Sequence, residues 1–230
     1  MSRRLVLATG NPHKVDELRA IFREVDLDVE LLSLTDVAGF AGSASGVKFS
    51  EPRETGATFA ENSRIKAVSY AMQTGMLCLA DDSGLEIDAL DGRPGVISSH
   101  YFCDGDEARA GGMSRAERDE RNNERVLREL SGVPEIQRAA RFVCLMTLAN
   151  PGPDGAGVSA QARGVMEGRI GMPPRVPAGE NGFGYDPLFL VAPAFERSSA
   201  ELSPGEKHAL SHRGHAARTM GGRIKALLGW

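Results

Sequence analysis

The chain has 230 residues, of which 41% are hydrophobic and 25% charged, and its formal net charge is −4. A chain of this length can bury a substantial core, and its composition is too hydrophobic for global disorder. A net-acidic protein has no global positive field for a nucleic acid backbone or an anionic membrane, so any affinity for phosphate is expected to be local.

We expect a soluble protein of the cytoplasm. The apolar run at residues 5–8 is too short for a secretory signal, and the sequence has no run of about 18 apolar residues that could span a membrane. The three cysteines cannot all pair within one chain, which suits a reducing compartment. Cys78 and Cys144 lie in apolar segments, as expected of core residues, whereas Cys103 lies in a polar segment that we expect to form a loop.

The first half of the chain alternates between predicted strands and helices. Residues 4–8 indicate a buried strand, and Pro12 stands at the first position of a helix with one apolar face. A capping box at residues 58–61 predicts the start of another helix, which Gly75 should end. Residues 76–80 form the next predicted buried strand.

The second half continues the pattern. Capping boxes at residues 114–117 and 203–206 predict two further helices, and a nearly continuous apolar run predicts a strand at residues 140–149. Residues 158–167 and 188–191 are further strand candidates. Strands that alternate with helices are typical of an α/β fold around one central sheet. Because the middle strands have no clear crossover helix between them, we expect the sheet to be mixed.

The first candidate site lies where a predicted strand passes into a helix, and it comprises Thr9, Gly10, Asn11, Pro12, His13 and Lys14. Helix N-termini present unpaired N–H groups, so a hydroxyl, a flexible glycine and a lysine here can bind phosphate. The spacing is not that of a Walker A loop. An ordinary capped turn with a solvated lysine explains the same segment equally well.

The second candidate site is a pair of adjacent acids, Asp81 and Asp82, directly after the predicted strand at residues 76–80. Adjacent carboxylates at the end of a buried strand repel each other and lose solvation, which a bound cation relieves. Mg2+ prefers such oxygen ligands and keeps several waters, one of which can act as the nucleophile. The alternative is a turn in which the aspartates bond to local backbone amides. Glu86 and Asp88 repeat the acidic pattern and favour the metal interpretation.

Two further segments suit a nucleotide. The first places two rings beside a carboxylate, which can stack on a base and bond to its edge, and it contains Phe183, Gly184, Tyr185 and Asp186. The second concentrates positive charge that suits a polyphosphate, and it contains Lys207, His212 and Arg213. The alternatives are a tight turn before the next strand and a solvated basic helix face.

Taken in order, these segments resemble the Ham1-like inosine triphosphate pyrophosphatases, also called non-canonical purine nucleoside triphosphate pyrophosphatases. The similarity runs from Leu5 to about Arg218. It is carried by residues 7–11 with Lys14, by residues 54–62, 80–85, 93–96 and 140–142, and by residues 182–187 and 211–214.

The resemblance implies one elongated domain over residues 1–230, a homodimer, and Mg2+-dependent hydrolysis of ITP, dITP or XTP to the monophosphate and pyrophosphate. It implies that residues 9–14 bind the triphosphate, that Glu54 and Asp82 ligate Mg2+, and that Asp82 accepts the proton of the attacking water. Phe183 would stack on the base. Further nucleotide contacts would come from Ser83, Gly184, Tyr185, Asp186, Lys207, His212 and Arg213.

Two features depart from the family pattern. His100 stands where the family usually has an arginine, which puts a phosphate contact from that position in doubt. The segment Gly39 to Arg53 is longer than usual, so the approach to Glu54 is expected to differ.

Three other interpretations stay open. A pyrophosphatase for standard or modified pyrimidine nucleotides would share the phosphate and metal parts. A nucleotide-binding regulatory module without turnover is less consistent with Glu54 and Asp82, because anionic side chains repel a triphosphate unless a metal intervenes. A zinc hydrolase would use His208, His212 and His215, but a helix break expected near Ser211 weakens that arrangement.

Overall fold

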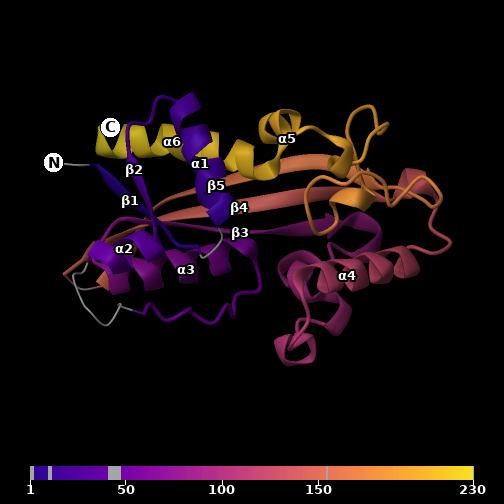
Figure 1. Ribbon diagram of the computed structural model, residues 1–230, viewed down its shortest axis with the longest axis horizontal. Coiled ribbons are helices and arrows are strands. Elements are labelled where there is room, and N and C mark those ends of the chain that lie inside the picture. Colours follow the sequence, from indigo (N-terminus) through magenta and orange to yellow (C-terminus); the bar gives the residue numbers. More distant parts are fainter. Residues whose placement is uncertain (1–2, 10–11, 41–47, 154, 230) are drawn as a thin grey trace. The chain divides into compact units, whose positions relative to one another are not determined.

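The computed structural model describes residues 3–9, 12–40, 48–153 and 155–229 (Figure 1). Within these ranges, six strands form one sheet in the order β2-β1-β3-β4-β5-β6. The strands are β1 (Arg4–Leu7), β2 (Glu30–Ser33), β3 (Cys78–Ile87), β4 (Ala139–Gly152), β5 (Gly155–Ile170) and β6 (Phe189–Val191). Strand β1 pairs in parallel with β2 and β3, whereas β5 pairs antiparallel with β6, so the sheet is mixed, as predicted.

The described α-helices are α1 (Pro12–Glu24), α2 (Leu34–Phe40), α3 (Phe59–Thr74), α4 (Arg115–Glu129), α5 (Pro204–Leu210) and α6 (His212–Leu228). The α/β class expected from the alternating pattern is therefore confirmed. Within the described part of the chain, no helix is long and apolar enough to cross a membrane.

The chain divides into two compact units. The first comprises Met1–Asp82, Cys144–Gly164 and Arg213–Trp230, and the second comprises Ser83–Val143 and Val165–His212. The long strands β3, β4 and β5 each contribute residues to both units.

The core of the first unit lies on both faces of its strands. Successive residues of a strand point to opposite faces, so Leu5 and Leu7 of β1 face one side and Val6 faces the other. Leu5 and Leu7 pack with residues of α1 and α6, such as Leu18 and Met220. Val6 belongs to a second cluster with residues of α2 and α3, and Figure 1 shows the two helix pairs on opposite sides of β1.

In the core of the second unit, α4 packs against those parts of β3, β4 and β5 that belong to this unit. Val126 and Leu130 of α4 belong to one cluster with Leu85 of β3, Phe142 of β4 and Met166 of β5. Fully burying an aliphatic side chain of this size contributes about 1.5–3 kcal/mol. The apolar face of α4 therefore fixes this helix in the second unit.

The predicted helix starts are confirmed because they rest on local bonds. α1 begins at Pro12, and the capping boxes at residues 58–61, 114–117 and 203–206 all form, with both reciprocal bonds present. Gly75 ends α3 in the left-handed conformation at φ 64°, where an L side chain would be strained.

Three sequence-based expectations were wrong. Strand β3 does not end at residue 80 but continues to Ile87, so Asp81 and Asp82 lie inside a strand and not in a turn. Cys103, expected in a loop, is the fully buried last residue of a short 3-10 helix (Gly95–Cys103), and its thiol donates to the carbonyls of His100 and Asp106. Of the exposed loop expected over residues 39–56, residues 39 and 40 belong instead to α2, residues 41–47 lie outside the described residues, and residues 48–56 form no helix or strand.

Candidate active site

Asp81 is a buried carboxylate held by two cations of the first unit. Its side chain is 2% exposed, and both of its oxygens accept bonds from Lys14 Nζ, at 3.0 and 2.9 Å. Arg213 donates to Asp81 Oδ2 through Nε and Nη2, each at 3.4 Å, and to Glu17 through Nη1 at 3.3 Å. Burial by itself would raise the pKa of Asp81, but Lys14 and Arg213 lower it well below its usual range. Asp81 is therefore ionised throughout the neutral range.

The helices explain why these cations meet. Lys14 lies in the first turn of α1 and Arg213 is the second residue of α6. A cation in the first turn opposes the helix macrodipole, so each needs an anion nearby. Asp81 supplies that anion, and burial would lower the pKa of Arg213 but Asp81 and Glu17 raise it. The arrangement keeps two positive groups in place beside the start of two helices.

Asp82 meets a different partner because neighbouring strand residues face opposite ways. Leu79 belongs to the cluster with α1 and α6, and Ala80 to the cluster with α3, so Asp81 and Asp82 follow the same alternation. Lys66 of α3 donates to Asp82 Oδ1 at 3.0 Å. The two adjacent acids therefore have separate surroundings.

Lys66 also joins Asp82 to a third acid. Its ammonium donates to Glu54 Oε2 at 3.0 Å, while Asp82 Oδ2 is buried and has no hydrogen-bond partner among the described residues. Burial opposes the charge of Lys66, but Asp82 and Glu54 raise its pKa above the ordinary value. Burial raises the pKa of Asp82 to about 6, with Glu54 and Asp81 adding to the rise and Lys66 opposing it. Asp82 is consequently a basic carboxylate with one unpartnered oxygen.

The carboxylates of Glu54 and Asp82 suit a divalent cation in part. The described residues contain no group of three or more acids, histidines or cysteines arranged to hold a metal ion. Mg2+ is commonly held by only one or two protein carboxylates, with the remaining ligands from water and substrate phosphates. The unpartnered oxygen of Asp82 beside Glu54 fits such a partial site. His208, His212 and His215 form no such group within the described ranges, and Ser211 ends α5 before His212 begins α6.

The loop at residues 182–186 of the second unit holds Phe183 at the surface, with 47% of that residue exposed. Asp186 Oδ2 accepts the backbone N–H of Phe183 at 2.9 Å and the ammonium of Lys207 at 2.5 Å. Gly182 has φ 89°, and a Cβ there would lie 2.3 Å from both Asp186 Oδ2 and Lys207 Nζ. A side chain is thus excluded at residue 182, and the loop presents an aromatic ring beside a paired lysine.

Tyr185 and His212 lie in more enclosed positions of the second unit. Tyr185 is 4% exposed and donates to the carbonyl of Ser98 at 2.7 Å, so its hydroxyl is used within the protein. The ring of His212 stacks on Phe142, with centroids 5.2 Å apart and planes 19° from parallel.

The predicted site residues fall into two groups, one in each unit. The first contains Lys14, Glu54, Asp82 and Arg213, and Thr9 follows β1 in the same unit. Gly10 and Asn11 lie outside the described residues, and of Pro12 and His13 only the backbone in α1 is described. The second group contains Ser83 of β3, Phe183, Gly184, Tyr185, Asp186, Lys207 and His212. Arg213 thus shares a cluster with Lys14, because both bond to Asp81.

Sequence reasoning missed Lys66. A signal was present, because Lys66 lies three residues after Ser63 and four before Tyr70, both on the buried face of α3. A lone lysine at a core-facing phase of an amphipathic helix indicates a buried acidic partner.

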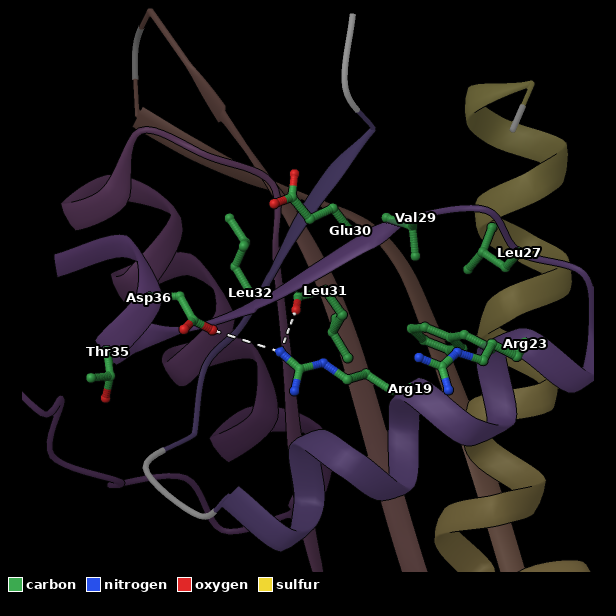
Figure 2. A pocket seen from close by; sticks show the side chains of 10 residues that line it. Arg19, Arg23, Leu27, Val29, Glu30, Leu31, Leu32, Thr35 and Asp36 are labelled. Atoms are coloured by element: carbon green, nitrogen blue, oxygen red, sulfur yellow. Dashed lines mark hydrogen bonds and ion pairs between the residues drawn. The ribbon is translucent and has the colours of Figure 1, made fainter. Parts of the chain in front are cut away.

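A cavity of about 700 Å³ lies elsewhere in the first unit, beside the edge strand β2 (Figure 2). Arg19 points across it, donates to the carbonyl of Leu31 and lies 3.7 Å from Asp36. Asp36 in turn accepts the N–H of Ser33 at 2.7 Å. Side chains thus form hydrogen bonds with backbone groups of the edge strand β2. None of the predicted site residues lines this cavity.

The chain is similar to known proteins over almost its whole length. The model of the Ham1 family matches residues 5–222. A dITP/XTP pyrophosphatase of an Exiguobacterium species is 43% identical over 96% of each chain, and one of Nitratidesulfovibrio vulgaris is 44% identical over 94% of this chain and 93% of that protein. The solved structure of a HAM1 protein from Coxiella burnetii is 36% identical, covers 97% of this chain and 99% of its own, and superposes with a TM-score of 0.77. The chain therefore belongs to the Ham1 family.

Proposed function

We propose that this chain is a cytoplasmic, Mg2+-dependent enzyme that hydrolyses the purine nucleotides ITP, dITP and XTP to the nucleoside monophosphate and pyrophosphate. Relatives at 43% and 44% identity over almost their whole length carry the name dITP/XTP pyrophosphatase. The observation that carries the proposal is that two adjacent acids, Asp81 and Asp82, have different partners. Asp81 is neutralised by two cations, whereas Asp82 keeps an unpartnered oxygen.

The triphosphate is assigned to Lys14 and Arg213. Asp81 holds both cations in place before substrate arrives, which lowers the reorganisation needed when phosphate binds. A lysine ammonium has three donors, and the bonds from Lys14 end on a single carboxylate. Lys14 is therefore able to donate to a phosphate oxygen while it stays paired with Asp81.

Glu54 and Asp82 are the residues that would hold Mg2+. Two carboxylates face the single charge of Lys66, and the free oxygen of Asp82 has no other partner within the described ranges. A bound Mg2+ supplies charge stabilisation at phosphate oxygens and increases the acidity of water. Lys66 holds the two carboxylates in a common position.

We assign to Asp82 the role of accepting the proton of the attacking water. A pKa of about 6 leaves the carboxylate mostly ionised at pH 7 and yet more basic than an ordinary aspartate. The water oxygen forms a bond to the α-phosphorus, its proton moves to the Asp82 carboxylate, and the bond from the α-phosphorus to pyrophosphate breaks. The products are one monophosphate and one pyrophosphate for each water consumed.

The base is assigned to Phe183 and Lys207. The exposed ring offers a stacking surface, and the Lys207 ammonium lies 5.7 Å from its centroid. An ammonium can only donate, so it suits the keto group at C6 of hypoxanthine and xanthine and not the amino group of adenine. A site built around such a bond rejects an analogue that cannot accept it.

Product analysis tests the proposal. With Mg2+, ITP, dITP and XTP should each give the monophosphate and pyrophosphate, while ATP and GTP should react much more slowly. The slower reaction of GTP, whose base shares the keto group at C6, is expected from the resemblance to the family and not from the bond of Lys207. Equal turnover of ATP would contradict the substrate assignment, and nucleotide binding without pyrophosphate release would favour a regulatory module. We also propose a homodimer, for which light scattering after size-exclusion chromatography should give twice the chain mass.

A further inference from the structure

One face of α4 contacts the loop that carries Phe183. Arg115, Asp119 and Asn123 are spaced four residues apart, so they share a face of the helix. The guanidinium carbon of Arg115 lies 4.0 Å from the centroid of the Phe183 ring. Asp119 Oδ2 accepts the N–H of Gly184 at 2.8 Å. Asn123 Nδ2 donates to the carbonyl of Gly184 at 3.0 Å. Three successive turns of α4 therefore engage two residues of the loop.

These contacts fix the ring and the guanidinium relative to each other. Both backbone polar groups of Gly184 are bonded to α4, and the N–H of Phe183 is bonded to Asp186. Asp119 also lies 3.8 Å from Arg115 Nε, so the same carboxylate contacts the loop and the guanidinium. Because Asp119 joins the two, Arg115 is held over the ring instead of extending into solvent.

Phe183 stays exposed although Arg115 stacks on its ring. With Arg115 stacked on one face, 47% of the residue is still accessible, whereas Phe189 of the core is fully buried. A flat ring has two large faces, and a guanidinium at 4.0 Å leaves no room for a base on its own side. The Lys207 ammonium lies farther from the ring, 5.7 Å from its centroid, whereas the guanidinium of Arg115 is in stacking contact.

We infer that Arg115 is a positioning residue that caps the closed face of Phe183, so that a purine stacks only on the open face and completes a guanidinium–ring–purine stack. This inference rests on the proposed function. Arg115 orders the ring before the base arrives, which lowers the entropic cost of binding, and its attraction to the ring is a cation–π contact. Its effect is on nucleotide affinity and not on the chemical step.

The variant Arg115→Ala tests the cap. We expect KM for ITP and the dissociation constant for IMP both to rise about threefold to tenfold, as for the loss of one cation–π contact, with kcat changed less than about twofold. Arg115→Lys keeps the positive charge but lacks the planar guanidinium, so KM for ITP and the dissociation constant for IMP should lie between those of the wild type and of Arg115→Ala. Arg118→Ala is the matched control, because it removes the same charge from α4 and its side chain has no hydrogen bond or ion pair among the described residues.

The outcomes separate the cap from other roles. If Arg115 were a cover that the base displaces, Arg115→Ala would bind IMP more tightly, and this result or unchanged affinity would overturn the inference. A fall in kcat with unchanged KM would also overturn it. Equal melting temperatures for the three variants and the wild type show that the fold is retained. If the wild type binds IMP but releases no pyrophosphate from ITP, the proposed function fails, while the IMP titrations still decide the role of Arg115.

Discussion

Replacing Asp81 by asparagine should lower the thermal stability of the protein sharply. The amide keeps the shape of the side chain but leaves Lys14 and Arg213 without their shared counter-charge. Removing one partner of a buried ion pair costs about 3–5 kcal/mol. At roughly 2–4 °C per kcal/mol for a chain of this size, the melting temperature should fall by about 6–20 °C.

The assay is thermal unfolding at pH 7 with and without tripolyphosphate. A phosphate anion can take the place of the missing carboxylate, so tripolyphosphate should stabilise Asp81→Asn more than it stabilises the wild type. Asp28→Asn is the control, because it removes an exposed carboxylate of the first unit that has no bonded partner within the described ranges. If Asp81→Asn melts within 2 °C of the wild type, Asp81 does not hold the two cations as argued.

Two further predictions concern the phosphates and the metal. Lys14→Ala should raise KM for ITP roughly tenfold to a hundredfold, because a charged hydrogen bond to phosphate is lost. It should also lower the melting temperature, because Asp81 loses one of its two cations, and an unchanged KM in a variant still folded at the assay temperature would remove Lys14 from the phosphate site. EDTA should abolish ITP hydrolysis and Mg2+ should restore it, because carboxylates such as Glu54 and Asp82 are poor zinc ligands without nitrogen or sulfur partners. If Zn2+ alone restored ITP hydrolysis, the zinc hydrolase with His208, His212 and His215 would be favoured instead.

The features that the sequence predicted well depend on bonds between near neighbours. Each capping box joins residues three apart, and Pro12 fixes its own φ angle, so helix starts follow from short windows. The apolar run of β4 predicted a strand for the same reason, since its pattern is visible within ten residues.

The course of β3 could not be predicted in this way. Aspartate and glycine are depleted in strands, so the segment after residue 80 is typical of a turn. The strand continues because Asp81 is bonded to Lys14, 67 positions away, and to Arg213, 132 positions away. Partners so far apart in the sequence cannot be recognised from the pattern of a short segment.

The sequence proposed residues for the candidate site but not which partner each of its acids would have. From the sequence we expected Asp81 and Asp82 to lie beside one cation. In the structure their side chains point to opposite faces of β3, so each acid has its own partners. The contacts of Arg115, Asp119 and Asn123 with the Phe183 loop also escaped notice. Their four-residue spacing was visible, but nothing in the sequence links α4 to a segment some 60 residues later.

The most direct test compares the wild type with Asp82→Asn on ITP, following IMP and pyrophosphate together with a melting curve for each protein. Asparagine cannot accept the proton, so turnover should fall roughly 10²-fold or more. Because burial disfavours the charge of Asp82, the neutral variant should melt no lower than the wild type above pH 6. Lost turnover with an unimpaired melt is the predicted result. Near-normal turnover of ITP by Asp82→Asn would contradict the mechanism.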